Sequence, residues 1–322
     1  MEFEDVNWMR AITKIQWFYF WSRSAMRYAR QRVTKKILIT KKYAGKELLD
    51  ITQCHQWIAD RIYNNIPTAV SRFGATEMVM LRKCEYKKLF QKTPRNFDAA
   101  MKQMKIYSGF FPDDYQSICK FHELMISLLP DIDLLGEWNL PMEEYFISKY
   151  MSNTQLTHLG ILEPWESNKP WSGALEGKRV VIIHPFADTI REQYARRQLI
   201  WNQKNILPDF ELRVVKAVQT IAGERDERFD DWFDALEYMY QETIKKEFDV
   251  AIIGCGAYGM PLALKIKKYG KIAIHLGGDT QLMFGIRGKR WEGFPYYNEY
   301  WVAPSENEKP RNASLVENAC YW

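Results

Sequence analysis

The 322-residue sequence has few of the residues that build disulfide frameworks or zinc sites. Its five cysteines are widely separated and form no CxxC pair, which excludes a disulfide-rich secreted scaffold and is typical of a reducing cytosol. The five histidines show neither HxxxH nor HExxH spacing, so we expect no zinc site. No apolar run approaches the roughly 18 residues of a membrane span, and the acidic start at Glu2, Glu4 and Asp5 is unlike a signal peptide. These absences predict a cytoplasmic protein.

Acidic residues are missing from residues 10–46, a stretch that holds eleven Lys or Arg and the aromatic run Trp17–Trp21. Basic side chains beside aromatics are typical of a helix that lies on an anionic membrane surface. The same features suit a helix that packs on the body of the protein or on a second subunit of a homo-oligomer. A nucleic-acid partner is not expected, because the net charge is only +5 and no recognised motif is present. We therefore expect residues 1–50 to form a basic helical arm, with the inner face of the cytoplasmic membrane as one candidate partner.

The rest of the chain is well supplied with core-forming residues, since 47% of the sequence is hydrophobic. A proline-flanked connector at 164–171 separates two halves, 51–170 and 171–322. Strands are predicted at 68–73, 132–138, 178–184, 211–217, 249–253 and 271–276. Helices are predicted at 53–63, 76–84, 115–129, 187–201, 229–246 and 260–269. This alternation predicts a Rossmann-like α/β domain over 51–322, in which helices cover both faces of a mostly parallel sheet.

A glycine-rich turn between a predicted strand and a predicted helix is the most informative motif. Gly254, Gly256 and Gly259 follow the strand at 249–253 in the spacing G-x-G-x-x-G. Such a turn lets a ligand approach the backbone, and it directs free N–H groups and the positive helix end toward an anion. It therefore indicates a phosphate site, with a nucleotide as the ligand. The alternative is a turn that needs glycine only to pack the helix close to the sheet, because an isolated motif of this kind is weak.

Polar residues follow several of the predicted strands. His184 ends one strand, while His275, Gly277 and Gly278 end another, with Gln281 close behind. Because the carboxyl ends of parallel strands lie along one edge of a sheet, we expect these residues to form a crevice with the glycine turn. Basic residues suited to a diphosphate come next in the sequence. They are Arg287, Lys289 and Arg290.

The first half repeats the order of strand, glycine and helix at residues 71–77. Arg72 lies at the strand end and Glu77 in the first helical turn, so the two form a candidate site pair. Taken alone, these residues favour a structural ion pair with an acid at a helix N-terminus.

Residues 72–77 read R-F-G-A-T-E, which resembles the R-F-G-D-G-E box of bacterial glycosyltransferases with the GT-D fold. The segments HPFADTI at 184–190, HLGG at 275–278 and GKRW at 288–291 look like related proteins of capsule and O-antigen gene clusters. The resemblance covers roughly residues 60–322 and excludes the arm. It implies a Rossmann-like enzyme that moves a sugar from a nucleotide-sugar donor to a glycan acceptor carried on a membrane lipid.

The resemblance also implies roles for individual residues. In the family, a D-x-E motif contacts a divalent metal and the donor diphosphate. Glu77 matches its Glu, but Ala75 stands in place of the Asp, and a single carboxylate binds Mg²⁺ or Mn²⁺ weakly, so metal dependence stays open. The base that activates the acceptor hydroxyl would be Glu77, His184 or Asp188. The residues expected to bind the donor are Arg72, Gly74, Gly254, Gly256, Tyr258, Gly259, His275, Gly277, Gly278, Gln281, Lys289 and Arg290.

Two other functions compete with a transferase. An NAD-dependent oxidoreductase would use the same glycine turn. Its dinucleotide fingerprint also requires an acidic residue at the end of the strand that follows the helix, where it binds the ribose of NAD. Here the nearest acid, Asp279, comes only after Gly277 and Gly278. A non-catalytic partner of a polysaccharide assembly complex is the other alternative, and the missing Asp at Ala75 is its best support.

Overall fold

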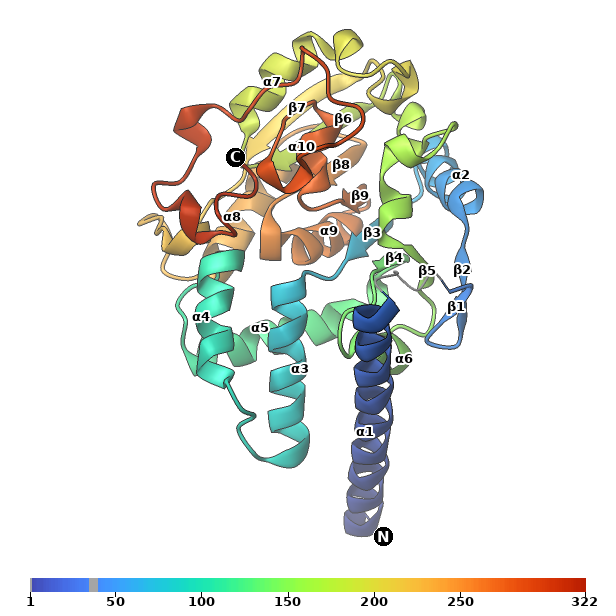
Figure 1. Ribbon diagram of the computed structural model, residues 1–322, viewed down its shortest axis with the longest axis vertical. Coiled ribbons are helices and arrows are strands. Elements are labelled where there is room, and N and C mark those ends of the chain that lie inside the picture. The colour runs from blue at the N-terminus through green and yellow to red at the C-terminus, as the bar shows by residue number, and fades with distance from the viewer. Residues whose placement is uncertain (1, 35–39) are drawn as a thin grey trace.

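The protein is described here from a computed structural model covering residues 2–34 and 40–322, with side chains described outside 2–12, 28, 31–34 and 204. Those side chains, and residues 35–39 of the predicted arm, lie outside the described part. Figure 1 shows one long helix, α1 (Glu2–Thr34), that projects away from an α/β body.

Nine strands of the described residues form one sheet in the order β1-β2-β5-β4-β3-β9-β8-β6-β7. All neighbouring pairs are parallel except β1 with β2. The strands are β1 (Lys42–Tyr43), β2 (Lys46–Leu49), β3 (Thr68–Arg72), β4 (Leu134–Glu137), β5 (Gln155–His158), β6 (Arg179–His184), β7 (Glu211–Lys216), β8 (Val250–Ile253) and β9 (Ile272–His275). The predicted mostly parallel sheet is confirmed.

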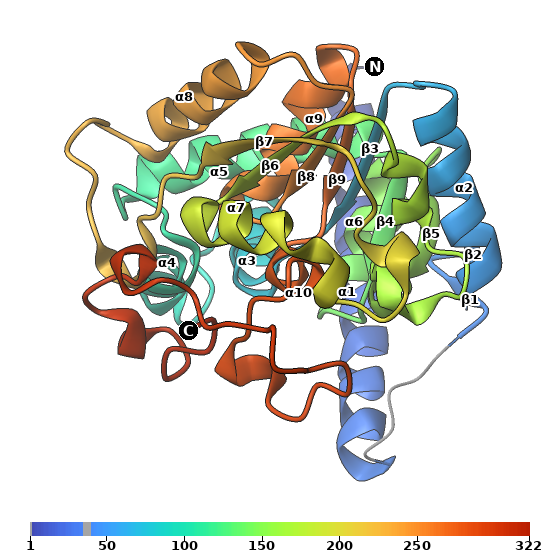
Figure 2. The same ribbon diagram turned by 90° about the horizontal axis from the view of Figure 1, so that it is seen from above.

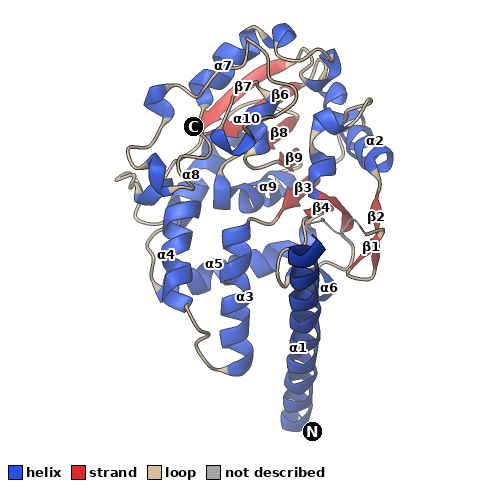
Figure 3. Ribbon diagram, in the orientation of Figure 1, coloured by secondary structure: helices blue, strands red, loops and turns tan. Residues whose placement is uncertain are grey.

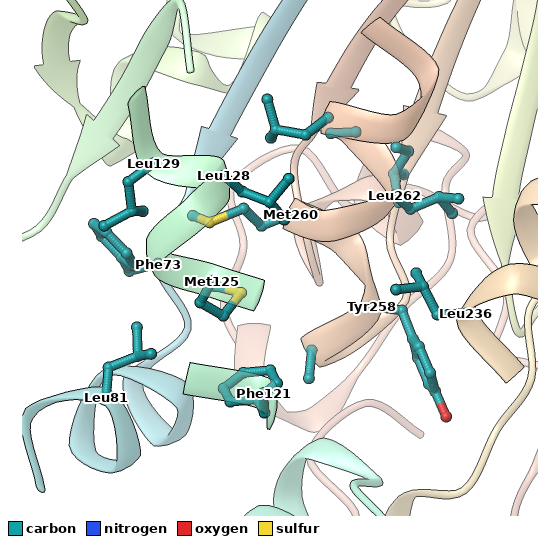
Figure 4. Close-up of a cluster of buried hydrophobic side chains, with 14 of the residues drawn as sticks. Phe73, Leu81, Phe121, Met125, Leu128, Leu129, Leu236, Tyr258, Met260 and Leu262 are labelled. Carbon is teal, nitrogen blue, oxygen red and sulfur yellow. The ribbon is translucent and has the colours of Figure 1, made fainter. Parts of the chain in front are cut away.

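Alternate residues of each central strand point to opposite faces, and each face has its own apolar core. Val181 and Ile183 of β6 pack in one core with α5, α8 and α9, whereas Val180 and Ile182 pack in the other with α2, α7 and α10. Figure 2 shows these layers from above, and Figure 4 shows Met125 and Leu128 of α5 beside Met260 of α9 in the first core. Burial on both faces explains why these strands are continuous apolar runs.

Helices surround the strands throughout the body (Figure 3). They are α2 (Ile51–Tyr63), α3 (Ala75–Phe90), α4 (Phe97–Ser108), α5 (Tyr115–Leu128), α6 (Glu143–Tyr150), α7 (Ala187–Ala195), α8 (Trp232–Ile244), α9 (Gly259–Lys268) and α10 (Asp279–Met283). Helices α4, α6 and α10 and strand β5 were not predicted from the sequence.

Two predictions from the sequence are wrong in extent. Residues 42–49 were assigned to the helical arm, but they form β1 and β2, because β2 pairs with β5 and the Lys46 ammonium donates to three carbonyl oxygens at 151–154. The helix predicted at 187–201 ends at Ala195. There the Arg196 N–H donates to the Gln193 carbonyl, and the chain tightens into a 3₁₀ turn at 197–199.

Helix α1 packs on the body through aromatic and arginine side chains. Trp17 is buried and meets the ring of Tyr145 edge-on, with ring centroids 5.0 Å apart. Arg23 and Arg27 both pair with the buried carboxylate of Glu144 in α6. This stretch therefore packs on the body, one of the two arrangements that the sequence left open.

A buried carboxylate, Glu85, ties α3 to α5 and α6. It accepts hydrogen bonds from His122 Nε2 (3.2 Å), Lys149 Nζ (2.7 Å) and the hydroxyls of Tyr145 and Tyr150 (3.0 Å each). Burial by itself raises the pKa of Glu85, but the hydrogen bonds from His122 and Lys149 outweigh it and hold the pKa well below its ordinary value. The ionised carboxylate therefore stabilises the folded state.

We expect this network to make stability depend on pH in the acid range. Because the folded pKa is depressed, its contribution is present above the unfolded value of about 4.3 and is lost as the pH falls toward the folded pKa. Glu85→Gln should cost about 1–2 kcal/mol at pH 7 in urea unfolding and should show a shallower loss of stability on acidification. Glu47→Gln, at an exposed pair with Lys42, is the matched control and should behave as the wild type. A wild-type–variant difference that stays constant between pH 7 and pH 3 would contradict this account.

Candidate functional site

A pocket of about 680 Å³ lies at the carboxyl ends of β3, β6, β7, β8 and β9. Strand β6 lies between β7, the next strand in sequence, and β8, so the strand order reverses beside it. In open α/β sheets, ligands bind at such a reversal, outside the carboxyl ends of the strands. Of the residues predicted as site residues, those that line the pocket are Arg72, His184, Gly254, Gly256, Tyr258, Gly277, Gly278 and Gln281.

Arg72, the last residue of β3, supplies the positive charge of the pocket. Its Nη1 donates to the Phe73 carbonyl oxygen (3.2 Å), and its Nε is buried without a hydrogen-bond partner in the described part of the chain. The guanidinium fills the space beside Gly277, where a Cβ atom would overlap it. No described carboxylate forms an ion pair with Arg72, Glu77 included, so the predicted structural ion pair is not made. Its charge is thus available to an anionic ligand.

His184, at the end of β6, presents a neutral ring to the pocket. Its Nδ1 accepts a hydrogen bond from the Phe186 backbone N–H (3.0 Å), so the ring proton is on Nε2. Burial lowers the pKa of His184 to about 3. A ring with this pKa is a weak base at neutral pH, whereas its Nε2–H is a hydrogen-bond donor. The structure therefore fits His184 better to binding a ligand oxygen than to accepting a proton.

The three glycines of the turn after β8 have different structural reasons. A Cβ at Gly254 would lie 2.6 Å from both the Gly277 carbonyl oxygen and the His184 ring, so glycine is required for the close approach of the strand ends. Gly256 has a φ of +57° and borders the pocket. Gly259 starts α9, and a Cβ there would overlap His275. Packing thus explains Gly259, and a ligand can approach only Gly254 and Gly256.

His275 lies behind the pocket and does not line it. Its Nδ1 is 3.1 Å from the Ser71 hydroxyl, and its Nε2 faces Gly259 without a hydrogen-bond partner in the described residues. Burial and the neighbouring Arg72 charge hold the pKa of His275 well below its ordinary value. The ring is therefore a neutral packing group between β3 and α9.

The far end of the pocket is built by residues that were not among the predicted site residues. Tyr107, Ser108 and Gly109 come from the end of α4, and residues 218–221 follow β7. The Thr220 hydroxyl donates to the Gly109 carbonyl oxygen (2.6 Å) and lies 3.2 Å from the Tyr258 hydroxyl. Phe186 and the aromatic pair Tyr321 and Trp322 close another side.

Glu77 lies in the first turn of α3, next to Arg72 in the chain but outside the pocket lining. Its carboxylate covers Gly74, where a Cβ would overlap it, and it has no ion-pair or hydrogen-bond partner in the described chain. Ala75 begins the helix without a second carboxylate. Within residues 2–34 and 40–322, no group of three or more His, Cys, Asp or Glu is placed to hold a metal ion. Glu77 is therefore the one carboxylate that this position offers to Mg²⁺ or Mn²⁺, and a single carboxylate is a poor site for either metal.

Three other predicted site residues lie outside the pocket. Asp188, in the first turn of α7, is half-exposed and pairs with Arg191 (2.6 Å). Lys289 and Arg290 hold the C-terminal segment, Lys289 by the Asn318 carbonyl and Arg290 by the Glu317 carboxylate and the Tyr321 hydroxyl. The structure thus gives them local partners and does not bring them to the ligand space.

Gln281 and Gly278 reach the pocket but also hold its wall. The Gln281 side chain donates to the carbonyls of Ile286, Arg287 and Tyr321 at 3.1–3.3 Å. A Cβ at Gly278 would lie 2.9 Å from the Tyr321 ring. These contacts bind the C-terminal aromatic pair to the glycine turn after β9.

Comparisons with protein-family models, with curated proteins and with solved structures find no match for this chain. Among the described residues, no helix has both the length and the apolar character needed to cross a membrane. The function is therefore argued from the pocket.

Proposed function

We propose that this protein is a glycosyltransferase that moves a sugar from a nucleotide-sugar donor to a lipid-linked glycan acceptor in surface polysaccharide synthesis, at the cytoplasmic side of the membrane. The observation that carries the proposal is the Arg72 guanidinium, which forms no ion pair among the described residues and faces a pocket at the strand-order reversal. Its Nε is buried without a hydrogen-bond partner in the described chain, and burial raises the pKa of the nearby Asp279 carboxyl, which weakens that group as a counter-ion. The arginine therefore favours an anionic ligand, and a planar guanidinium suits a diphosphate. The GT-D resemblance of residues 72–77 agrees with this ligand.

The chemistry then divides among Arg72, His184, the backbone of the glycine turn and Glu77. The bond between the sugar C1 and the diphosphate oxygen breaks, and Arg72 with the Nε2–H of His184 stabilises the charge that develops on that oxygen. The Gly254 N–H already donates to the Ile183 carbonyl oxygen, so in this turn it is the Gly256 N–H that adds to this stabilisation. A new bond forms between C1 and the acceptor oxygen, and Glu77 takes the acceptor's proton. Of the three predicted bases, Glu77 is the carboxylate nearest to Arg72 in the chain and has no competing partner in the described residues.

Thermal unfolding in the presence of UDP, GDP, CMP, dTDP, NAD and NADH, each with and without Mn²⁺, tests the proposal. A ligand at about 100 times its Kd should add about 2.7 kcal/mol, which raises Tm by several degrees. We expect one nucleoside diphosphate to raise Tm, since its diphosphate would form an ion pair with Arg72. A response only to NADH would replace this proposal with an oxidoreductase.

A non-catalytic partner of a polysaccharide assembly complex is the second candidate, and Ala75 favours it because the position lacks the acid of the resembling box. The two candidates differ in turnover. Slow hydrolysis of the bound nucleotide-sugar by water, which many transferases perform, would be seen for the enzyme and lost in Glu77→Gln. Binding of the nucleotide with no hydrolysis and no transfer would favour the partner protein.

A further inference from the structure

A groove of about 900 Å³ lies between α1 and α3, apart from the candidate donor pocket. Its apolar wall consists of Trp17, Phe18 and Trp21 from α1 and Tyr86 from α3. Trp17 is buried, but Phe18 and Trp21 keep 56% and 55% of their surface exposed. The groove is therefore open to solvent along an aromatic edge.

The charged residues of the groove are all cations. They are Arg82, Lys83 and Arg95, and no described carboxylate lines it. The Arg82 guanidinium is half-buried and has neither an ion pair nor a hydrogen-bond partner in the described chain, and burial lowers the pKa of Arg82. The nearby buried acids are engaged elsewhere, Glu85 with Lys149 and Glu144 with the arginines of α1. A desolvated cation without a counter-ion is costly, so an anion from outside the chain would satisfy Arg82.

The exposed apolar residues of the described chain are concentrated on α1, whose Phe18 and Trp21 line this groove. Of fifteen large hydrophobic side chains that are exposed, five lie on α1 within three to four helical turns. They are Ile15, Phe18, Tyr19, Trp21 and Met26. Exposed aromatics next to cations are typical of side chains that enter the headgroup region of a membrane. Figure 1 shows that α1 runs past α3 and stands out from the body, where a flat surface can reach it.

We propose that the α1–α3 groove binds the phosphate headgroup of an anionic membrane phospholipid, with Arg82 on the phosphate and the exposed aromatics of α1 among the acyl chains. Charge complementarity selects this occupant. A second copy of the chain would bring only cations to the groove, whereas a self-complementary contact needs both signs. Arg82 follows Ala75 by seven residues, which is about 10 Å along α3, so a bilayer bound here lies close to the donor pocket. This inference rests on the groove alone, so it does not depend on whether the protein is a glycosyltransferase.

Co-sedimentation of the full-length protein with vesicles tests this site. We expect binding to phosphatidylcholine vesicles that contain 30% phosphatidylglycerol and little binding to phosphatidylcholine alone. Arg82→Gln should weaken binding by about fivefold, the effect of one basic residue near an anionic surface. Phe18→Ser with Trp21→Ser should weaken it by at least about tenfold, because two aromatic side chains no longer leave water.

Arg311→Gln is the matched control, since it removes the same charge from an exposed residue of the C-terminal segment and should leave vesicle binding unchanged. Arg82→Gln should keep the wild-type Tm, because Arg82 has no partner in the described chain to lose, whereas Phe18→Ser also removes an edge contact with Phe90. Equal weakening by Arg82→Gln and Arg311→Gln would overturn the proposal, as it would show a response to net charge alone. Two other results would also overturn it. One is displacement of vesicles by millimolar glycerol 3-phosphate, which would make the site one for soluble phosphate. The other is a dimer in analytical ultracentrifugation that Trp21→Ser dissociates.

Discussion

Arg72→Ala should lower kcat/KM for sugar transfer by about 100- to 1000-fold, the usual cost of removing a group that stabilises charge in a transition state. Arg72 is the cation that lines the pocket at the ends of β3 and β9, and it forms no ion pair among the described residues. Removal of its guanidinium leaves the leaving diphosphate without a positive partner. The measurement is initial rates with the nucleotide-sugar that gives the thermal shift, together with the Kd of the nucleoside diphosphate by calorimetry.

Two further variants separate charge from geometry at this position. Arg72→Lys keeps the charge but loses the planar fork, so we expect an intermediate loss. Arg311→Ala removes an arginine that does not line the pocket and should keep the wild-type rate. If Arg72→Ala retained wild-type nucleotide affinity and rate, the pocket would not be the donor site.

Gly254→Ala should destabilise the folded protein by about 3 kcal/mol, toward the upper end of the cost of overpacking a core. The added methyl group would lie 2.6 Å from the Gly277 carbonyl oxygen, 2.6 Å from His184 and 2.8 Å from Thr280. Two of these contacts are with groups fixed by neighbouring strands, so the strand ends must move apart. Urea unfolding measures the loss, and Tm should fall by several degrees.

Gly160→Ala is the control for the glycine prediction. Gly160 lies in a 3₁₀ turn, and a Cβ there would meet no atom within 4 Å, so the same substitution should change stability by less than about 0.5 kcal/mol. If Gly254→Ala and Gly160→Ala were equally stable, the ends of β8 and β9 would be able to move apart at little cost. That result would contradict the tight packing of these strand ends around Gly254.

Part of the candidate site could be predicted from the positions at which the predicted strands end. Arg72, His184, Gly254 and Gly277 each come at the end of a predicted strand, and parallel strands place such ends on one edge. The structure gathers all four around one pocket. The alternation of strands and helices likewise predicted the mostly parallel sheet and its two covered faces, which are confirmed.

The rest depended on tertiary contacts that no local pattern encodes. Gly109 reaches the pocket only because α4 ends against the loop after β7, through the Thr220 hydroxyl. Asp188 and Arg290 follow the right strands, but their side chains turn to Arg191 and Glu317. Strand β2 forms because it pairs with β5, although its residues were assigned to the helical arm. The donor, the acceptor and the catalytic roles stay predictions.

The pairing of β3 with β9 also has a consequence for how this chain is made. Ser71 and His275 lie side by side in the fold but 204 positions apart in the sequence. While the ribosome synthesises the chain, β3 cannot pair with β9 until residue 275 has emerged. Until then, the backbone donors and acceptors on that edge of β3 stay unpaired. Such distant pairing slows folding and leaves an edge to which other nascent chains can add. The yield of soluble protein should therefore rise when synthesis is slowed by low temperature or when chaperones cover the waiting strand.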